Sequence, residues 1–200
     1  MKFTTIATSV LLSGLAAADD IQSKPFKLVL DSSANGSLNG KTISSCHSGA
    51  AIEGLCIGED KDSEYQTYYL NTTQGATSPV EGYEPSGKLV WNMPYSGGVE
   101  SEAMQFFYDP STNVAHPLFE PSYTSTYVSF DEKDGEMAIF SYVDDTKNPP
   151  VSGAFKARKQ WYACTTYFTG YTYHTLDWVV GNGEPQNPSC VKTEVKRVFL

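Results

Sequence analysis

The stretch VKTEVKRVF, residues 191–199, decides the fold class. Two sets of side chains alternate along it: Val191, Thr193, Val195 and Phe199 against Lys192, Glu194 and Lys196. A period of two is that of a β-strand with one buried face and one wet face. The stretch FKLVL, residues 26–30, has the same period, with Phe26, Leu28 and Leu30 on one side. Both ends of the chain therefore predict strands.

The residues between these two stretches also favour strands. Short runs rich in β-branched and aromatic residues, bounded by Gly, Pro, Asn or Asp, are typical of strands between turns. They cover residues 65–70, 89–93, 104–108, 127–130 and 137–143. Asp134-Gly135 between the last two predicts a hairpin, because a tight turn needs positive φ. Helical signals are scarce, and only residues 154–162 could form a short helix.

We therefore expect a single all-β domain over residues 19–200. The spacing of the turn signals predicts an antiparallel β-sandwich or barrel of about ten to twelve short strands. A β-trefoil is the alternative, although no matching internal copies are evident. The chain carries a net charge of −9. That charge argues against a polyanionic partner such as nucleic acid.

The first 18 residues, MKFTTIATSVLLSGLAAA, predict a secretory signal peptide. Lys2 supplies the positive charge, a short apolar stretch follows, and Ala16–Ala18 provide the small residues that a signal peptidase needs. The apolar stretch is too short for a permanent membrane span, and no later segment is long enough. We expect an extracellular or cell-wall protein that has no membrane span.

Four cysteines fit an oxidising compartment. They allow three pairings, and the local one, Cys46–Cys56 with Cys164–Cys190, is the one we expect. A zinc site has little support because there is no CxxC, so we expect no metal. Two sequons predict N-glycosylation at Asn35 and Asn71.

Catalytic motifs are lacking, and we nominate no catalytic residue and no cofactor. There is no GxSxG, and the three histidines lie in unrelated contexts. His116 precedes Pro117, which predicts an extended loop. A pair of carboxylates for glycoside hydrolysis stays open, but no motif identifies two among 23 acidic residues.

The most distinctive stretch is aromatic, with seven rings within residues 161–178. Tyr and Trp offer a flat apolar face and a hydrogen-bonding tip, which suit sugar rings or a protein partner. Alternatively, one face fills the core and the other packs beneath the loop closed by Cys164 and Cys190. The candidate binding residues are Trp161, Tyr162, Tyr167, Tyr171, Tyr173 and Trp178.

Four segments resemble a family of small secreted proteins of filamentous ascomycete fungi, a domain of unknown function. They are SKPFKLVLDS (23–32), LNGKTISSCHSGAAIEGLCIG (38–58), WYACTTYFTGYTYHTLDWVVG (161–181) and EPQNPSCVKTEVKRVFL (184–200). The resemblance covers nearly the whole mature chain and implies a fungal extracellular or wall-associated protein. It supplies no catalytic residues.

We therefore expect a non-enzymatic secreted monomer that binds at the cell wall or at a host surface, as an effector or elicitor does. Its partner would be a wall polysaccharide or a host surface protein. A glycoside-acting hydrolase and a structural wall component are the alternatives.

Overall fold

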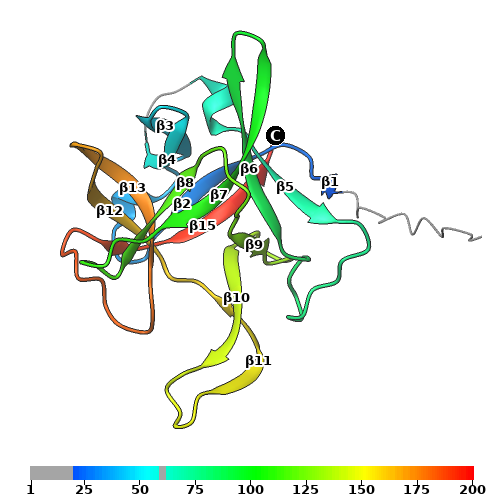
Figure 1. The fold of residues 1–200 in the computed structure, drawn as a ribbon, viewed down its shortest axis with the longest axis vertical. Coiled ribbons are helices and arrows are strands. Elements are labelled where there is room, and N and C mark those ends of the chain that lie inside the picture. Colours follow the sequence, from blue (N-terminus) through cyan, green and yellow to red (C-terminus); the bar gives the residue numbers. More distant parts are fainter. Residues whose placement is uncertain (1–19, 59–61) are drawn as a thin grey trace, which may run out of the picture.

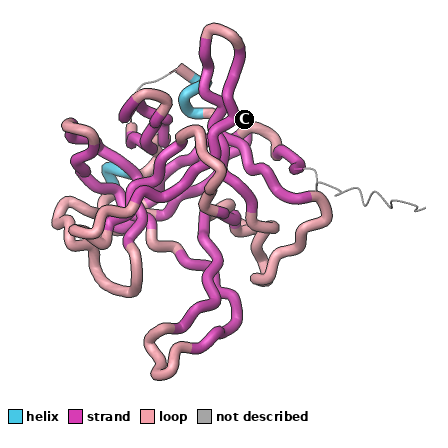
Figure 2. Tube along the Cα trace, in the orientation of Figure 1, coloured by secondary structure: helices cyan, strands magenta, loops and turns pink. Residues whose placement is uncertain are grey.

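The computed structural model describes residues 20–58 and 62–200, so the predicted signal peptide lies outside the described residues. The described part contains fifteen strands and two short 3-10 helices, η1 (Gly36–Leu38) and η2 (Ser63–Gln66). The strands are β1 (Asp20–Gln22), β2 (Phe26–Asp31), β3 (Ile43–Gly49), β4 (Ile52–Ile57), β5 (Tyr68–Thr73), β6 (Gly87–Tyr95), β7 (Gly98–Phe107), β8 (Val114–Phe119), β9 (Tyr127–Phe130), β10 (Met137–Asp144), β11 (Val151–Arg158), β12 (Trp161–Phe168), β13 (Tyr171–Val179), β14 (Val191–Lys192) and β15 (Glu194–Phe199). Figure 2 shows how little of the chain is helical.

The strands form one antiparallel sheet that curls strongly into a half-barrel (Figure 1). Ten strands follow one another in the order β11-β10-β9-β6-β7-β8-β4-β13-β12-β14. The all-β prediction is confirmed, but the expected ten to twelve strands are fifteen, and a sandwich, a closed barrel or a trefoil is not confirmed.

The two stretches that predicted strands at the chain ends pair with each other. β15 runs antiparallel to β2, with Val195 opposite Leu30 and Phe199 opposite Phe26. Phe26, Leu30 and Val195 are buried, as the period of two predicted, whereas Phe199 is about half exposed. Residues 191–199 form two strands rather than one, because Thr193 bonds to Trp161 and Asp31 between β14 and β15.

The main apolar core draws on strands as far apart in the sequence as β2 and β15, so segments near the two ends of the described chain share one interior. Its largest fully buried side chains are Trp91, Trp161, Tyr68, Phe26, Phe119 and Phe130. Burial of such rings is the main source of stability in a chain with so little helix.

The hairpin predicted at Asp134-Gly135 is present. β9 pairs with β10 through Met137 opposite Phe130, and Gly135 adopts a φ of 73°. Its N–H donates to the carbonyl of Asp131 across the turn. Positive φ is a conformation that glycine adopts without steric penalty, which explains this residue at the turn.

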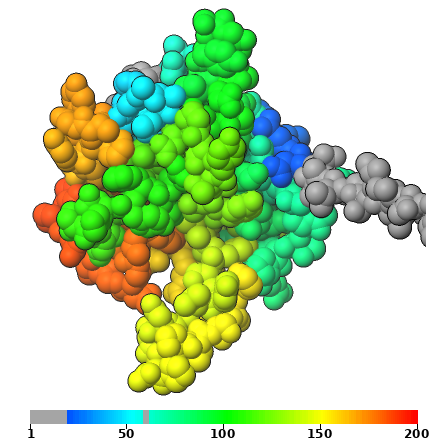
Figure 3. Space-filling view, in the orientation of Figure 1, coloured from blue at the N-terminus to red at the C-terminus, as the bar shows by residue number. Residues whose placement is uncertain are grey.

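The short helix expected at residues 154–162 is wrong: residues 154–158 lie in β11, residues 161 and 162 lie in β12, and residues 159 and 160 connect the two strands. Ile139 lies opposite Arg158 and Ser141 opposite Lys156, so pairing with β10 determines the backbone of β11. Among the described residues β11 pairs only with β10. The β10–β11 hairpin projects from the body of the molecule, as the yellow segment in Figures 1 and 3 shows.

Two disulfides cross-link the fold, Cys46–Cys56 and Cys164–Cys190, and they are the pairing that the sequence analysis expected. The first joins neighbouring strands β3 and β4. The second ties the loop before β14 to β12. Within the described ranges, no helix is long and apolar enough to cross a membrane.

Candidate functional site

The aromatic stretch forms the β12–β13 hairpin, whose eight paired positions run from Trp161↔Trp178 to Phe168↔Tyr171. At its base, Trp161 is 0% exposed and Trp178 is 8% exposed, with ring centroids 4.9 Å apart. The indole N–H of Trp161 donates to the carbonyl of Met137 at 3.0 Å. These two tryptophans belong to the core, and a binding role for either of them stays a prediction.

The tip of the same hairpin lies beyond the core. Tyr167 is 77% exposed and Tyr171 is 69% exposed, and the Tyr173 ring lies 6.5 Å from that of Tyr171. Thr169 and Gly170 make the turn with φ of 48° and 96°. We name Tyr167, Tyr171 and Tyr173 the tyrosine tip; Figure 3 shows the end of this hairpin in orange.

Tyr162, the remaining candidate, lies near the base of the hairpin. Its ring is half-buried, and the ammonium group of Lys192 lies 4.7 Å from the ring centroid. The ammonium group therefore covers a face of the Tyr162 ring that a ligand would need. Of the six predicted residues, three lie at the tip, where the register places Tyr171 and Tyr173 on one face of the hairpin and Tyr167 on the other, and three lie at the base.

The hairpin tip is anchored to the neighbouring strands. The Phe168 ring lies 5.3 Å from that of Phe107 in β7 and 5.2 Å from that of His116 in β8. The hydroxyl of Thr169 donates to the carbonyl of Ser48 at 2.6 Å. The tyrosine tip is therefore presented on a fixed support rather than on a free loop.

A hollow of about 320 Å³ lies between the hairpin and the ends of β7 and β8. We call it the hairpin hollow. It is lined by Phe107, Asp109, Ser111, Thr112, Val114, His116, Thr166, Tyr167, Phe168, Asp177 and Asn187. Its volume is at the lower end of the range of about 300–1,000 Å³ for small-molecule sites.

Sequence reasoning missed the buried pair in this hollow, His116 and Asp177. The Nδ1 of His116 lies 2.7 Å from an oxygen of Asp177, and the other oxygen accepts the hydroxyl of Thr175 at 2.8 Å. Burial raises the pKa of the Asp177 carboxyl, whereas the hydrogen bond from His116 opposes that rise. The loop predicted for His116 is wrong, because the residue lies in β8, where all six residues are buried.

Two further hollows share Ser141, Val143, Arg158 and Asn182 and together follow the β10–β11 hairpin. The inner one reaches Phe106, Tyr108 and Trp178 and has a volume of about 320 Å³. Trp178 is thus a core residue with one edge at a surface depression.

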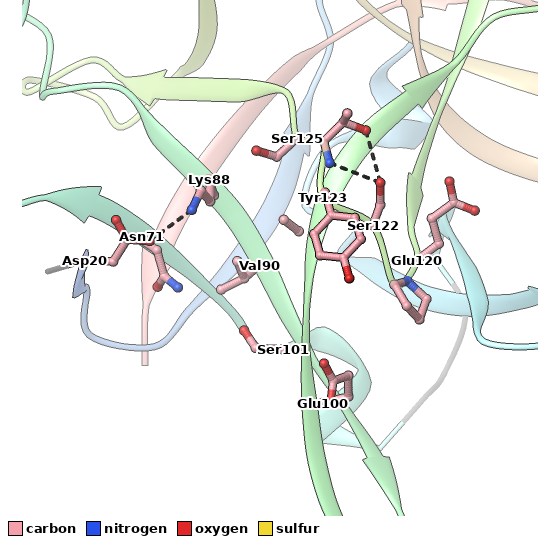
Figure 4. A pocket seen from close by; sticks show the side chains of 13 residues that line it. Asp20, Asn71, Lys88, Val90, Glu100, Ser101, Glu120, Ser122, Tyr123 and Ser125 are labelled. Atoms are coloured by element: carbon pink, nitrogen blue, oxygen red, sulfur yellow. Dashed lines mark hydrogen bonds and ion pairs between the residues drawn. The ribbon is translucent and has the colours of Figure 1, made fainter. Parts of the chain in front are cut away.

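The hollow shown in Figure 4 has a volume of about 440 Å³ and lies over β5, β6 and β7. Asn71 lies at its wall, and its side-chain oxygen accepts a hydrogen bond from Gln22 at 3.1 Å. Lys88 pairs with Asp20 beside it, and Tyr123 lies on the other side of the hollow. The second predicted glycosylation site, Asn35, caps η1 by accepting from the N–H of Ser37. Glycosylation at both positions stays a prediction.

A buried acid pair lies away from these hollows. The carboxyl groups of Glu53 in β4 and Glu102 in β7 lie next to each other, the residues are 7% and 1% exposed, and neither carboxyl oxygen of Glu102 has a hydrogen-bond partner among the described residues. Burial, with the charge of Glu53 as a second cause, raises the pKa of Glu102 to about 8. Glu102 therefore keeps a proton at neutral pH. Within residues 20–58 and 62–200, no group of three or more His, Cys, Asp or Glu side chains could hold a metal ion.

A known protein family matches most of the chain. A family described as "Domain of unknown function (DUF7907)" matches residues 23–199. No curated protein and no solved structure matches the chain. The match spans every strand from β2 to β15 and both disulfides. The chain therefore belongs to the family of the domain of unknown function DUF7907.

Proposed function

We propose that the protein is a non-enzymatic, secreted binding protein that acts at the cell wall or at a host surface, as an effector or elicitor does. One observation carries the proposal: the tyrosine tip exposes Tyr167 and Tyr171 by 77% and 69% on an anchored hairpin. Wall polysaccharide is the partner that this tip fits best. A tyrosine ring offers a planar face for a sugar ring, and its hydroxyl can hydrogen-bond the sugar's hydroxyl groups.

The anchoring of the tip adds to this argument. Binding is weakened when flexible side chains and loops must be ordered. Phe168 and Thr169 hold the turn against β8 and β3, and a tyrosine side chain has only two rotatable χ angles. The tip therefore loses little conformational entropy when it meets a ligand.

One structural feature and one feature of the sequence are compatible with secretion. Both disulfides are of the kind that persists in oxidising compartments. The predicted signal peptide points the same way, and the resemblance to secreted ascomycete proteins supplies the fungal setting of this proposal.

The buried acid pair favours binding over hydrolysis. A glycoside hydrolase needs two acids about 5–10 Å apart with the glycosidic bond between them. Glu53 and Glu102 instead contact each other, and Glu102 is 1% exposed. A polysaccharide would have to displace packed strands to reach them.

The tyrosine tip can be tested by removing two rings. The double variant Tyr171→Ala/Tyr173→Ala should lose retention on chitin or β-glucan by about tenfold or more, which corresponds to about 1.4 kcal/mol. Its melting temperature should stay that of the parent protein, because Tyr171 is exposed. Tyr123→Ala is the matched control, since it removes a fully exposed tyrosine from another loop and should change neither property.

Retention of the double variant equal to that of the parent protein would contradict the role of the tip. Failure of the parent protein to bind any polysaccharide or any host surface would contradict the function itself. Release of reducing ends from a polysaccharide would favour the hydrolase, and permanent retention in the wall fraction would favour the structural component.

A further inference from the structure

The hollow shown in Figure 4 lies on the face of the sheet opposite to the core, and we call it the Asn71 hollow. Asn71 in β5 lies opposite Lys88 in β6. Two residues further along β6, Val90 lies opposite Ala103 in β7. Because side chains alternate along a strand, these four share one face, whereas Leu89 points to the core. The side chain of Asn71 therefore lines the hollow rather than the interior.

The segment between β8 and β9 forms the opposite wall of the Asn71 hollow. Residues 120–125 line it, and the fully exposed ring of Tyr123 lies across the hollow from Asn71 (Figure 4). The N–H of Thr126 donates to the carbonyl of Met104 at 2.8 Å, which attaches this segment to β7. The volume of about 440 Å³ lies within the range of about 300–1,000 Å³ for small-molecule sites. The hollow is thus large enough for a sugar residue.

The amide of Asn71 is arranged in a way that is compatible with an attached sugar. Asn71-Thr72-Thr73 is a sequon, in which the side-chain nitrogen of the asparagine is the atom that N-glycosylation modifies. The side-chain oxygen of Asn71 accepts a hydrogen bond from Gln22 at 3.1 Å. Glycosylation leaves this oxygen unchanged, so the bond to Gln22 can persist while the nitrogen carries the sugar. The first sugar would then start at the wall of the hollow.

The lining of the hollow matches the chemistry of a sugar residue. Ala103 gives an apolar patch at the floor, and Tyr123 offers a planar ring to the apolar face of a sugar. The side chains of Glu100, Ser101 and Ser125 also line the hollow, and none of them has a hydrogen-bond partner among the described residues. Burying sugar hydroxyl groups without partners is unfavourable, and these three side chains can supply partners.

We propose that the Asn71 hollow holds the first N-acetylglucosamine of an N-glycan attached to Asn71, with the sugar packed against Tyr123 and hydrogen-bonded to Ser101 and Ser125. The proposal rests on the predicted glycosylation of Asn71 and is independent of the polysaccharide contact at the tyrosine tip. A sugar tethered at the wall has an effective concentration on the order of millimolar, so weak contacts are enough to hold it. The rest of the glycan leaves beside Glu100, which is exposed.

NMR of the glycosylated protein from a eukaryotic host tests the contact directly. Mass spectrometry of glycopeptides should find a glycan at Asn71, and the acetyl methyl group of its first sugar should give nuclear Overhauser effects to the Tyr123 ring. An unmodified Asn71 would overturn the proposal at its first step. A glycan at Asn71 without Overhauser effects to Tyr123 would overturn the placement of the sugar while confirming the glycosylation. Neither result bears on the tyrosine tip. Protein made in bacteria carries no N-glycan, so Tyr123→Ala remains the control for the tip in that material.

Enzymatic removal of the glycans adds a second, independent measurement. Peptide N-glycosidase F cleaves the bond between asparagine and the first sugar, so it acts only while that sugar is out of the hollow. If the sugar is held for nine-tenths of the time, release from the folded protein should be about tenfold slower at Asn71 than at Asn35. Asn35 is the internal control, because it is also half-buried with its side-chain oxygen bonded and does not line the hollow. Equal release at the two positions in the folded protein contradicts the proposal, and denatured protein should release both glycans at the same rate.

A variant that fills the hollow links the two measurements. Ser101→Trp places a large ring in the hollow from an exposed position in β7, so the Overhauser effects to Tyr123 should be lost and release at Asn71 should approach that at Asn35. Ser152→Trp is the matched control, because Ser152 is an exposed serine in β11 that does not line the hollow. Unchanged Overhauser effects and release rates in a folded Ser101→Trp protein contradict the proposal. If that variant fails to fold, the comparison of Asn71 with Asn35 in the parent protein decides.

Discussion

The base and the tip of the β12–β13 hairpin contain the same kinds of residue in one continuous strand pair, yet their surroundings are opposite. Trp161 and Trp178 at the base pack in the core, whereas Tyr167 and Tyr171 at the tip face solvent. The curled sheet covers only the part of the hairpin that lies against it. An aromatic side chain therefore stabilises the fold or remains free to bind according to its position along the strand.

Truncation at the base should produce the largest effect. Trp161→Ala removes a fully buried ring and the hydrogen bond to Met137, which should lower the free energy of unfolding by about 3–5 kcal/mol. Denaturant unfolding measures this loss. A loss of unfolding free energy as small as that expected for an exposed tyrosine would contradict the proposed difference between base and tip.

Removal of the second disulfide tests whether the cross-link or the apolar packing stabilises the base of the β12–β13 hairpin. The double variant Cys164→Ala/Cys190→Ala opens a loop with a separation of 26 residues and should lower stability by roughly 3.5 kcal/mol. The pair Cys46→Ala/Cys56→Ala opens one of 10 residues, and its loss should be smaller by roughly 0.8 kcal/mol. Equal melting temperatures for the parent protein and the first variant would show that packing alone suffices.

Burial also changes the behaviour of an acidic side chain, as the buried carboxyl group of Glu102 shows. The pKa of Glu102 is raised to about 8 in the folded protein, against 4.5 for the unconstrained group. Between these values the unfolded chain loses a proton that the folded protein keeps, so stability falls as the pH rises from about 4.5 to 8. Glu102→Gln should remove this dependence and increase stability at pH 8 by on the order of 2 kcal/mol.

Unfolding by urea at pH 5 and pH 8 measures the effect of the acid pair. Glu132→Gln is the matched control, because Glu132 is exposed in the turn between β9 and β10 and is not among the groups that raise the pKa of Glu102. A steeper loss of stability with pH in the Glu102→Gln protein than in the parent protein would contradict the raised pKa of Glu102.

The smallest effect is expected at the tip. Tyr167→Ala should change the free energy of unfolding by no more than about 0.5 kcal/mol, because its ring is 77% exposed. Thermal unfolding of Tyr167→Ala and Trp161→Ala under the same conditions measures the difference between tip and base. A loss above about 2 kcal/mol would mean that the tip contributes to the core after all.

Local patterns in the sequence predicted the parts of the fold that depend on neighbouring residues. The period of two placed Leu28 and Val195 correctly, and Asp134-Gly135 predicted its hairpin. The segment 154–162 was mispredicted because its strand conformation depends on pairing with β10 rather than on its own residues.

The candidate sites depend on distant partners, and their geometry was not predictable. His116 and Asp177 are 61 residues apart, and β8 is buried along its whole length, so no alternation marked it as a strand. The period of two does group Trp161 with Trp178, but it does not say where along a strand the core ends. That boundary arises from the curl of the whole sheet.

The projecting strand β11 lies at one end of the hydrogen-bonded path, and no strand of the described part of the chain pairs with the outer side of its backbone. Open edges of this kind invite strand addition and aggregation, and charged side chains on the edge discourage it. Lys156 and Arg158 supply two positive charges there on an otherwise acidic molecule. Two copies that met edge to edge would bring four cations together, whereas an extended acidic segment would meet no such repulsion.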